Sequence, residues 1–190
     1  MSLDTLIADF KQQLKSALSA HVNQLKGTYP DLYGYAILPG DEFSVSHLVA
    51  AFNREGDLEA RSHFPGVSET YYRFSVDEWK HYDQTGLGTV TPIIQELVDR
   101  YGRLNPTDDW EGWGLGKVAP RVEAGLLARL HSVLLEAMFE LKKTGVFRLE
   151  QSDLFLAIWI SDSHASIMFD SIARLNSDSV VTQFNKEFLT

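Results

Sequence analysis

Apolar residues recur every three or four positions near the start of the chain, which is the spacing of one face of an α-helix. Ser2 is placed to cap this helix and Gly27 to end it. The mean apolar step of about 3.67 residues is that of a straight helix lying on a domain rather than of a coiled coil. The pattern therefore predicts a long amphipathic helix over residues 3–26. Its stripe is Leu3, Ile7, Phe10, Leu14, Leu18, Val22 and Leu25.

Two strands are predicted after Pro30. Residues 33–38 form an apolar run that leads into Leu38-Pro39-Gly40-Asp41, where Pro and Gly stand as a type II turn requires. Residues 43–52 alternate between two faces, as a strand does. We expect these two strands to pair antiparallel.

Weaker patterns follow in the middle of the chain. The charged residues 54–67 indicate a loop, and residues 69–74 are a possible third strand. Ser75-Val76-Asp77-Glu78 has the order of a capping box, which predicts a short helix through Trp79 and Tyr82.

The second half of the chain is predicted to be mainly helical. Apolar stripes indicate helices near residues 90–103, 118–144, 164–175 and 179–188, and Gly145 is placed to end the longest of them. Between these helices, residues 154–160 are apolar on both faces and stop at Ser161-Asp162-Ser163. This run predicts a strand covered on both faces, near the centre of a sheet.

The elements together predict an α+β fold. Its sheet is expected to be mostly antiparallel or mixed, with about four to five strands, near residues 33–38, 43–52, 69–74 and 154–161. A length of 190 residues suits one domain over residues 1–190.

Composition narrows the classes of function. The chain has no cysteine, which excludes a disulfide framework, a thiolate metal site and a cysteine nucleophile. No apolar run approaches the roughly 18 residues of a membrane span, and residues 1–26 carry charges unlike those of a signal peptide. We therefore expect a cytoplasmic protein.

Charge suggests the kind of partner. Seventeen Lys and Arg against 26 Asp and Glu give a formal net charge of −9, which repels nucleic acid and anionic lipid and favours a basic protein partner. The segment 105–117 is rich in glycine and combines two tryptophans with acidic residues, a mixture suited to binding such a partner. The alternative is that the tryptophans pack onto the following helix. The candidate partner-binding residues are Asp108, Asp109, Trp110, Glu111 and Trp113.

Sequence motifs for catalysis are missing. The chain has no serine nucleophile elbow, no paired histidines on a helix and no phosphate-binding loop. Its six histidines lack the spacing that places ligands on one helical face, so no metal and no cofactor is expected, although distant segments could still combine into a metal site.

One polar cluster contains the residue types of a hydrolytic triad. Asp162, Ser163 and His164 are consecutive, so their side chains point in different directions and cannot relay a proton among themselves. The favoured interpretation is that Asp162 and Ser163 cap the next helix. The alternative is a polar site at the end of the strand, where ligands bind in many α/β proteins.

Five segments stand out together along the chain: Leu32-Tyr33-Gly34-Tyr35-Ala36-Ile37, Tyr72-Arg73-Phe74-Ser75-Val76-Asp77-Glu78-Trp79, Leu141-Lys142-Lys143-Thr144-Gly145-Val146-Phe147, Ile158-Trp159-Ile160-Ser161-Asp162-Ser163 and Arg174-Leu175-Asn176. In this order and spacing they resemble a bacterial family, the domain-of-unknown-function 4303 family. The resemblance implies an α+β domain without known activity, and some such domains are similar in genomic habit to immunity proteins that neutralise secreted toxins.

Three hypotheses of function follow. The first is a non-enzymatic binding module, an immunity-type protein of a bacterial cytoplasm that neutralises a basic toxin. The second is a small-molecule-binding protein or hydrolase with its site at Asp162, Ser163 and His164. The third is a scaffold protein that dimerises through its long helices, so that the chain is expected to be a monomer or a homodimer.

Overall fold

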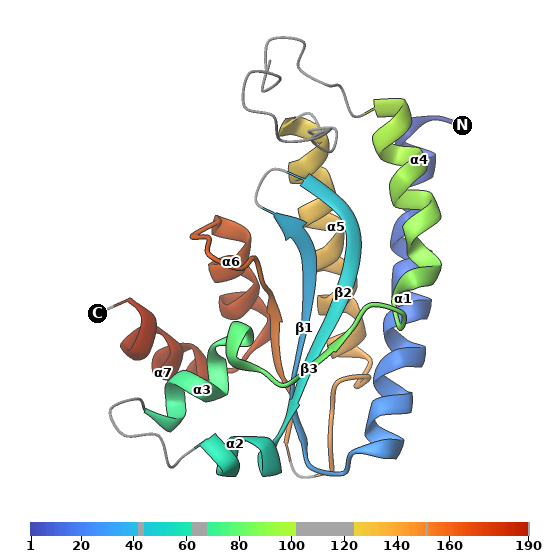
Figure 1. Ribbon diagram of the computed structural model, residues 1–190. Helices are drawn as coiled ribbons and strands as arrows, with labels where there is room; N and C mark the ends of the chain where they lie inside the picture. Colours follow the sequence, from blue (N-terminus) through green and yellow to red (C-terminus); the bar gives the residue numbers. More distant parts are fainter. Residues whose placement is uncertain (42–43, 62–67, 102–123, 151, 190) are drawn as a thin grey trace, which may run out of the picture.

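The computed structural model describes residues 1–41, 44–61, 68–101, 124–150 and 152–189 (Figure 1). These residues form an α+β fold, as the hydrophobic patterns predict. A mixed four-stranded sheet has the order β3-β2-β1-β4, and helices cover both of its faces and one edge. The segment 105–117 and the beginning of the predicted helix 118–144 lie outside the described residues.

The sheet is built on a long hairpin. Strand β1 (Leu32–Asp41) pairs antiparallel with β2 (Ser44–Arg54), and β2 pairs antiparallel with β3 (His81–Asp83). Strand β4 (Phe155–Ile158) pairs parallel with β1. The prediction that β4 lies at the centre is therefore wrong, because it forms an edge of the sheet.

Helix α6 (Ser166–Leu175) and the residue after it explain how an apolar strand can stand at the edge of the sheet. Asn176, directly after α6, accepts from the Leu156 amide at 2.9 Å and donates to the Leu156 carbonyl at 2.7 Å. Ser171 Oγ accepts from the Ile158 amide at 2.9 Å. These side chains take the place of a further strand, so the backbone groups of β4 are satisfied at its outer edge.

Three amphipathic helices cover one face of the sheet (Figure 1): α1 (Leu3–Thr28), α4 (Thr91–Tyr101) and α5 (Ala124–Lys143). The Ser2 side chain accepts from the Thr5 amide, which confirms the predicted cap, and α1 ends one residue beyond Gly27. The predicted stripe is largely buried, with Phe10, Leu14, Leu18 and Val22 fully inaccessible to solvent.

Other helices and a 3₁₀ turn cover the opposite face. They are α2 (Glu55–Arg61), α3 (Glu69–Phe74), the 3₁₀ turn η1 (Val76–Glu78) and α7 (Asp178–Phe188). Their aromatic side chains pack on the sheet: Phe74 and Trp79 both contact Phe155. Gly34 is required beneath Trp79, since a Cβ there would lie 2.7 Å from the indole ring.

Two predictions for residues 54–74 are wrong. Residues 69–74 form helix α3 rather than a strand, because Ser68 caps a helix by accepting from the Tyr71 amide and Glu69 stands in its first turn. Tyr72 and Phe74, which alternate as in a strand, are simply the buried side of a short helix. Helix α2 occupies part of the expected loop 54–67, with Glu55 and Asp57 in its first turn.

Two predicted turns also differ from the structure. Residues 38–41 belong to β1, where Gly40 has φ 121° beside a shift of register, so the glycine serves a bulge rather than a type II turn. The capping box at residues 75–78 gives only η1, and Ser75 forms no side-chain cap there. Strand β3 then takes the place of the expected helical residues near Tyr82.

The helix ends elsewhere match the sequence closely. A 3₁₀ turn, η2 (Gly88–Val90), precedes α4, and Gly145 follows α5 with φ 81°, the conformation expected of a glycine that ends a helix. Within the ranges that the structure describes, no helix combines the length and the apolar character needed to cross a membrane.

Candidate functional site

A pocket of about 440 Å³ opens where β4 ends, between α3, η1, α6 and α7. β4 is extended by Trp159, whose amide donates to the Ile37 carbonyl at 2.9 Å. Asp162 then adopts a left-handed backbone with φ 54°, and Ser163 Oγ accepts from the Ala165 amide at 3.0 Å. This tight turn sends the chain back along β4 as α6 and leaves its polar side chains at the mouth of the pocket.

The walls of the pocket are aromatic. Phe184 and Phe188 stack on α7 with ring centroids 4.6 Å apart, and Tyr71 of α3 stacks on Phe188 at 5.6 Å. Trp159 and Phe169 complete the aromatic lining. Aromatic rings attract cations and planar groups, so this wall favours a ligand of that kind.

The Trp159 indole is the unusual group of the wall. It is only 6% exposed, and its Nε1 has no hydrogen-bond partner among the described residues. The other described tryptophan, Trp79, donates from Nε1 to the Arg73 carbonyl at 3.2 Å. Buried donors are nearly always satisfied, so the unpaired donor of Trp159 requires an explanation.

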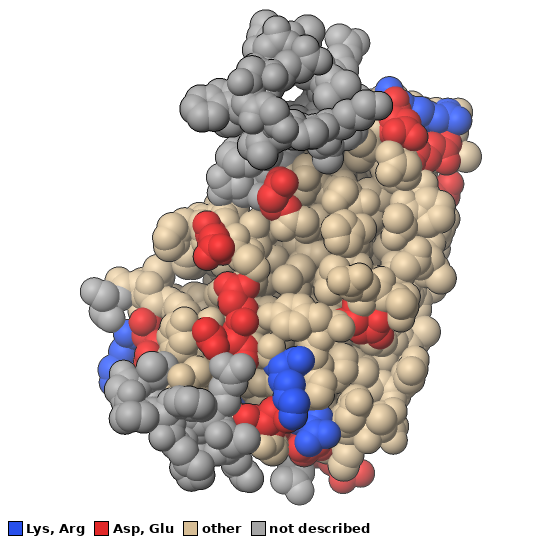
Figure 2. All heavy atoms as spheres, in the orientation of Figure 1, with Lys and Arg blue, Asp and Glu red and all other residues tan. Residues whose placement is uncertain are grey.

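The mouth of the pocket is acidic. Asp77 of η1 lines it and accepts a hydrogen bond from Ser161 Oγ, and Asp162 and His164 line it with exposed side chains. Figure 2 shows acidic groups distributed over the part of this face that α3 and α6 occupy. Negative charge beside aromatic rings selects for a cationic ligand.

The structure describes only one of the two predicted groups of site residues. Asp162, Ser163 and His164 all line the pocket, whereas Asp108, Asp109, Trp110, Glu111 and Trp113 lie outside the described residues. The predicted helix cap is wrong, because α6 starts after Ala165 without a side-chain cap. Ser163 Oγ instead accepts from the Ala165 amide, in the turn that precedes the helix.

Several lining residues have no clear signal in the sequence. Trp159 belongs to an apolar run and is easily taken for a core residue, and Asp77 is part of an apparent capping box. Tyr71 and Phe188 stand in segments far apart in sequence that only the packing of α3 on α7 brings together.

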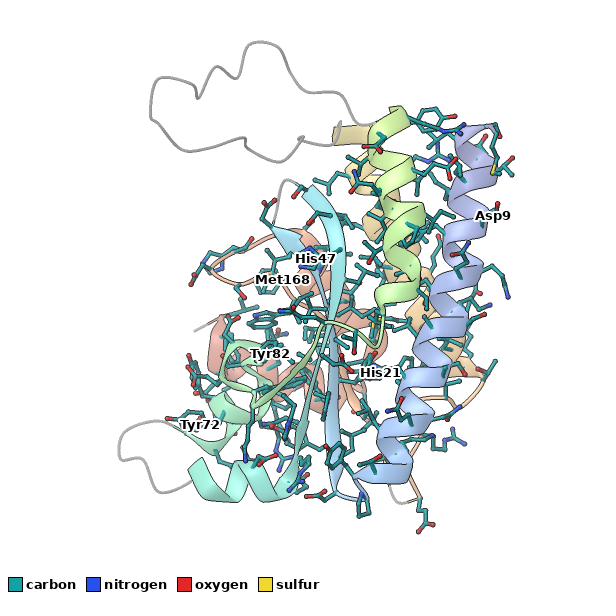
Figure 3. The ribbon with its side chains drawn as sticks, turned by 45° about the vertical axis from the view of Figure 1, so that its right-hand side comes forward. Asp9, His21, His47, Tyr72, Tyr82 and Met168 are labelled. Carbon is teal, nitrogen blue, oxygen red and sulfur yellow. The ribbon has the colours of Figure 1, made fainter. Side chains whose placement is uncertain are left out.

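A second polar cluster lies on the opposite side of the sheet, between α1 and β1 (Figure 3). His21 Nδ1 lies 3.0 Å from the Tyr35 hydroxyl, and its Nε2 lies 3.2 Å from Asp83 Oδ2, an electrostatic contact without the geometry of a hydrogen bond. Burial lowers the pKa of His21, although Asp83 opposes this, and burial raises the pKa of Tyr35 above its usual range. The neutral imidazole therefore accepts from Tyr35 and directs its N–H toward Asp83.

This cluster is closed to ligands. Tyr35 is fully buried and His21 is 3% exposed. Asp83 Oδ1 is already occupied, since it accepts from the Thr85 amide, the Thr85 hydroxyl and the Gly86 amide. A Cβ on Gly86 would lie 2.7 Å from the His21 ring, so no space is left above the imidazole.

A third polar cluster joins α2 to β3. Asp57 accepts from Lys80 Nζ and His81 Nε2, each at 2.8 Å, and lies 3.3 Å from Arg54 Nε. Burial opposes ionisation of Asp57, but the bonds from Lys80 and His81 still lower its pKa below the usual value. These contacts hold α2 against β2 and β3. The described residues also hold no group of three or more His, Asp or Glu arranged to bind a metal ion.

Comparison with known proteins gives one match. No curated protein and no solved structure matches the chain. A family model described as Domain of unknown function (DUF4303) matches residues 14–177, which include the Asn176 cap on β4 and most of the pocket lining but neither Phe184 nor Phe188. The match covers most of the chain and agrees with the resemblance of the five segments. The chain belongs to the DUF4303 family.

Proposed function

We propose that this chain is a non-enzymatic binding protein for a basic protein partner, an immunity-type protein that neutralises a basic toxin in a bacterial cytoplasm. The observation that carries the proposal is the pocket at the end of β4, where Asp77 and Asp162 stand beside aromatic walls. Carboxylates next to aromatic rings bind cationic side chains through charge and cation–π contacts.

The charge of the whole chain supports the same partner. A formal net charge of −9 attracts a basic protein over distances of about a Debye length, roughly 8 Å in physiological salt, and so accelerates association. The pocket then supplies the short-range contacts that charge alone lacks. Aromatic residues near the centre of an interface commonly carry much of the binding energy.

Co-expression with the product of the adjacent reading frame tests the proposal. The tagged chain should copurify with that product and should restore growth of cells that express it. Asp162→Asn should weaken the complex roughly tenfold, because it removes a charge at the mouth of the pocket. Asn tolerates the left-handed backbone at this position as well as Asp does, so the turn is retained.

A matched control is available on α1. Asp9 is exposed on the far side of the molecule from α6 and α7 (Figure 3), and Asp9→Asn removes the same charge. If the two variants lose affinity equally, only net charge matters and the pocket has no role. If no complex forms and growth is not restored, the proposed function is wrong.

A second candidate function is binding or hydrolysis of a small molecule, favoured by the position of Asp162, Ser163 and His164 in the lining of the pocket. Thermal shift against common metabolites and metal ions tests binding, since a ligand that binds only the folded chain raises its melting temperature. Ester hydrolysis that disappears in Ser163→Ala would establish this function and contradict the first. No thermal shift and no hydrolysis would exclude it.

A further inference from the structure

We infer that the pocket at the end of β4 takes an arginine side chain of the partner, and that the Trp159 indole N–H donates to a backbone carbonyl of the same segment. This inference rests on the proposed function and adds the chemistry of the group that is recognised. The pocket volume of about 440 Å³ lies near the lower end of the range for ligand sites, which suits one long side chain and its peptide group.

The chain itself contains an arginine bound between an aromatic ring and a carboxylate, which is the arrangement inferred for the pocket and its partner. Arg73 lies over the Tyr33 ring at 4.8 Å and binds both carboxylate oxygens of Glu55, at 2.9 and 2.8 Å. One face of the guanidinium thus meets an aromatic ring while its edge meets a carboxylate, as its shape and charge favour. These contacts also raise the pKa of Arg73, and the main cause is the hydrogen bond that Arg73 donates to Glu55.

The pocket likewise brings aromatic rings and carboxylates together. Tyr71 and Phe188 form a stacked pair in the wall, and Asp77 and Asp162 supply carboxylates at the mouth. None of the described lining residues is Lys or Arg. A planar guanidinium can stack on a ring and bind a carboxylate edge-on, whereas an ammonium group is a point charge that is more strongly hydrated. The pocket should therefore prefer arginine to lysine.

Trp159 supplies the second half of the inference. Its Nε1 is a buried donor without a partner, and a guanidinium has no acceptor to offer it. The acceptor must then come from another part of the occupant, and a backbone carbonyl next to the arginine is the nearest one. Met168 also lines the pocket, and its unbranched side chain can change rotamer to admit that carbonyl.

The probe is the peptide acetyl-Gly-Arg-Gly-amide, titrated into the full chain while indole N–H resonances are followed by NMR. Trp159→Phe identifies the resonance of Trp159 by its disappearance. The arginine peptide should move this resonance in a saturable way, with weak affinity because one side chain buries little area. The same peptide with lysine should bind several-fold more weakly, and the peptide with citrulline, which keeps the shape but loses the charge, at least about tenfold more weakly.

Variants separate the pocket from the rest of the surface. Asp162→Asn and Asp77→Asn should each weaken the arginine peptide severalfold, and Asp9→Asn should leave it unchanged. An unchanged indole N–H resonance of Trp79 and unchanged backbone amide resonances would verify that each variant is folded. Equal binding of the arginine and citrulline peptides, or a Trp159 resonance that does not move, would overturn the inference.

The peptide and the partner give separable answers. If the partner binds through the pocket but the arginine peptide does not, the proposed function stands and this inference is wrong. If the arginine peptide binds but no partner is captured or neutralised, the site stands and the proposed function is wrong.

Discussion

Two polar clusters lie on opposite faces of the same sheet and differ in one respect. The Tyr35–His21–Asp83 cluster is closed, since each of its polar groups faces another group of this chain and the core covers Tyr35 and His21. The pocket at the end of β4 is open, with exposed Asp162 and His164 and an unpaired indole donor. Both contain a histidine and an aspartate, so residue types alone do not separate a structural cluster from a binding site. Access to solvent does, because the core covers Tyr35 and His21 whereas Asp162 and His164 are exposed.

The difference follows from the helices that cover each face. Long amphipathic helices on the α1 side bury a continuous stripe and leave no room beside His21. Helices α3 and α7 meet at aromatic side chains, and they leave a hollow where β4 ends. The account predicts that changes in the closed cluster alter stability, whereas changes in the pocket alter binding.

The largest expected contrast is between the two histidines. His21→Ala should lower the free energy of unfolding by about 3 kcal/mol, because it opens a cavity and leaves the buried Tyr35 hydroxyl without a partner. His164→Ala, at an exposed position, should change it by less than about 0.5 kcal/mol. Urea denaturation at pH 7.5 measures both. Similar losses in the two variants would break the comparison.

A second contrast uses two glycines. Gly86→Ala places a Cβ against the buried His21 ring and should cost about 2 kcal/mol, the usual effect of overpacking. Gly88→Ala has nothing within 4 Å of the new Cβ and should be close to neutral. If Gly86→Ala is equally neutral, the space above His21 is not closed.

The closed cluster also predicts a dependence on pH. The pKa of His21 is lowered by burial, so between this value and about 6.5, the value in the unfolded chain, the unfolded state binds the proton and the folded state does not. Stability should therefore fall as the pH decreases below about 6.5, by at most about 1.4 kcal/mol per pH unit for this group. Burial lowers the pKa of His131 as well, which adds a change in the same direction.

NMR titration of the His21 ring checks this prediction directly. The resonance should titrate with a midpoint below 6.5, and His21→Gln should reduce the pH dependence measured by urea denaturation. A midpoint above 6.5 would mean that Asp83 outweighs burial, and the neutral imidazole described here would be wrong.

The smallest expected effect on stability distinguishes the two described tryptophans. Trp79→Phe loses the bond to the Arg73 carbonyl and should cost about 1 kcal/mol beyond the change in packing. Trp159→Phe removes a donor that has no partner, so the loss of the N–H should not destabilise the fold. Chemical denaturation should show the larger loss for Trp79→Phe. The reverse order would indicate that the Trp159 donor is satisfied in solution.

Much of the fold could be predicted from periodicity. The stripe of α1, the hairpin of β1 and β2 and the glycine after α5 follow from local rules, because each element determines its own pattern of buried positions. The pattern of residues 69–74 wrongly predicts a strand, because a short buried helix and a short strand leave similar patterns.

The edge position of β4 could not be predicted, because an apolar strand indicates burial and not what buries it. Here Ser171 and Asn176 close the edge from a helix that follows in sequence. The candidate site has the same limit, because its sequence pattern does not show which distant segments pack around it. Asp162, Ser163 and His164 were identified as a polar group, but the aromatic wall depends on the packing of α3 against α7 and on an unpaired indole donor, which only the structure shows.

The claim that the open pocket is the binding site is tested most directly by the affinity of the basic partner for Asp162→Asn and Asp9→Asn, measured side by side by isothermal titration. Both variants lose one negative charge from exposed positions, and only one of them lines the pocket. The account predicts a roughly tenfold loss for Asp162→Asn and almost none for Asp9→Asn. Equal affinities of the two variants, or no binding by the unmodified chain, would contradict it.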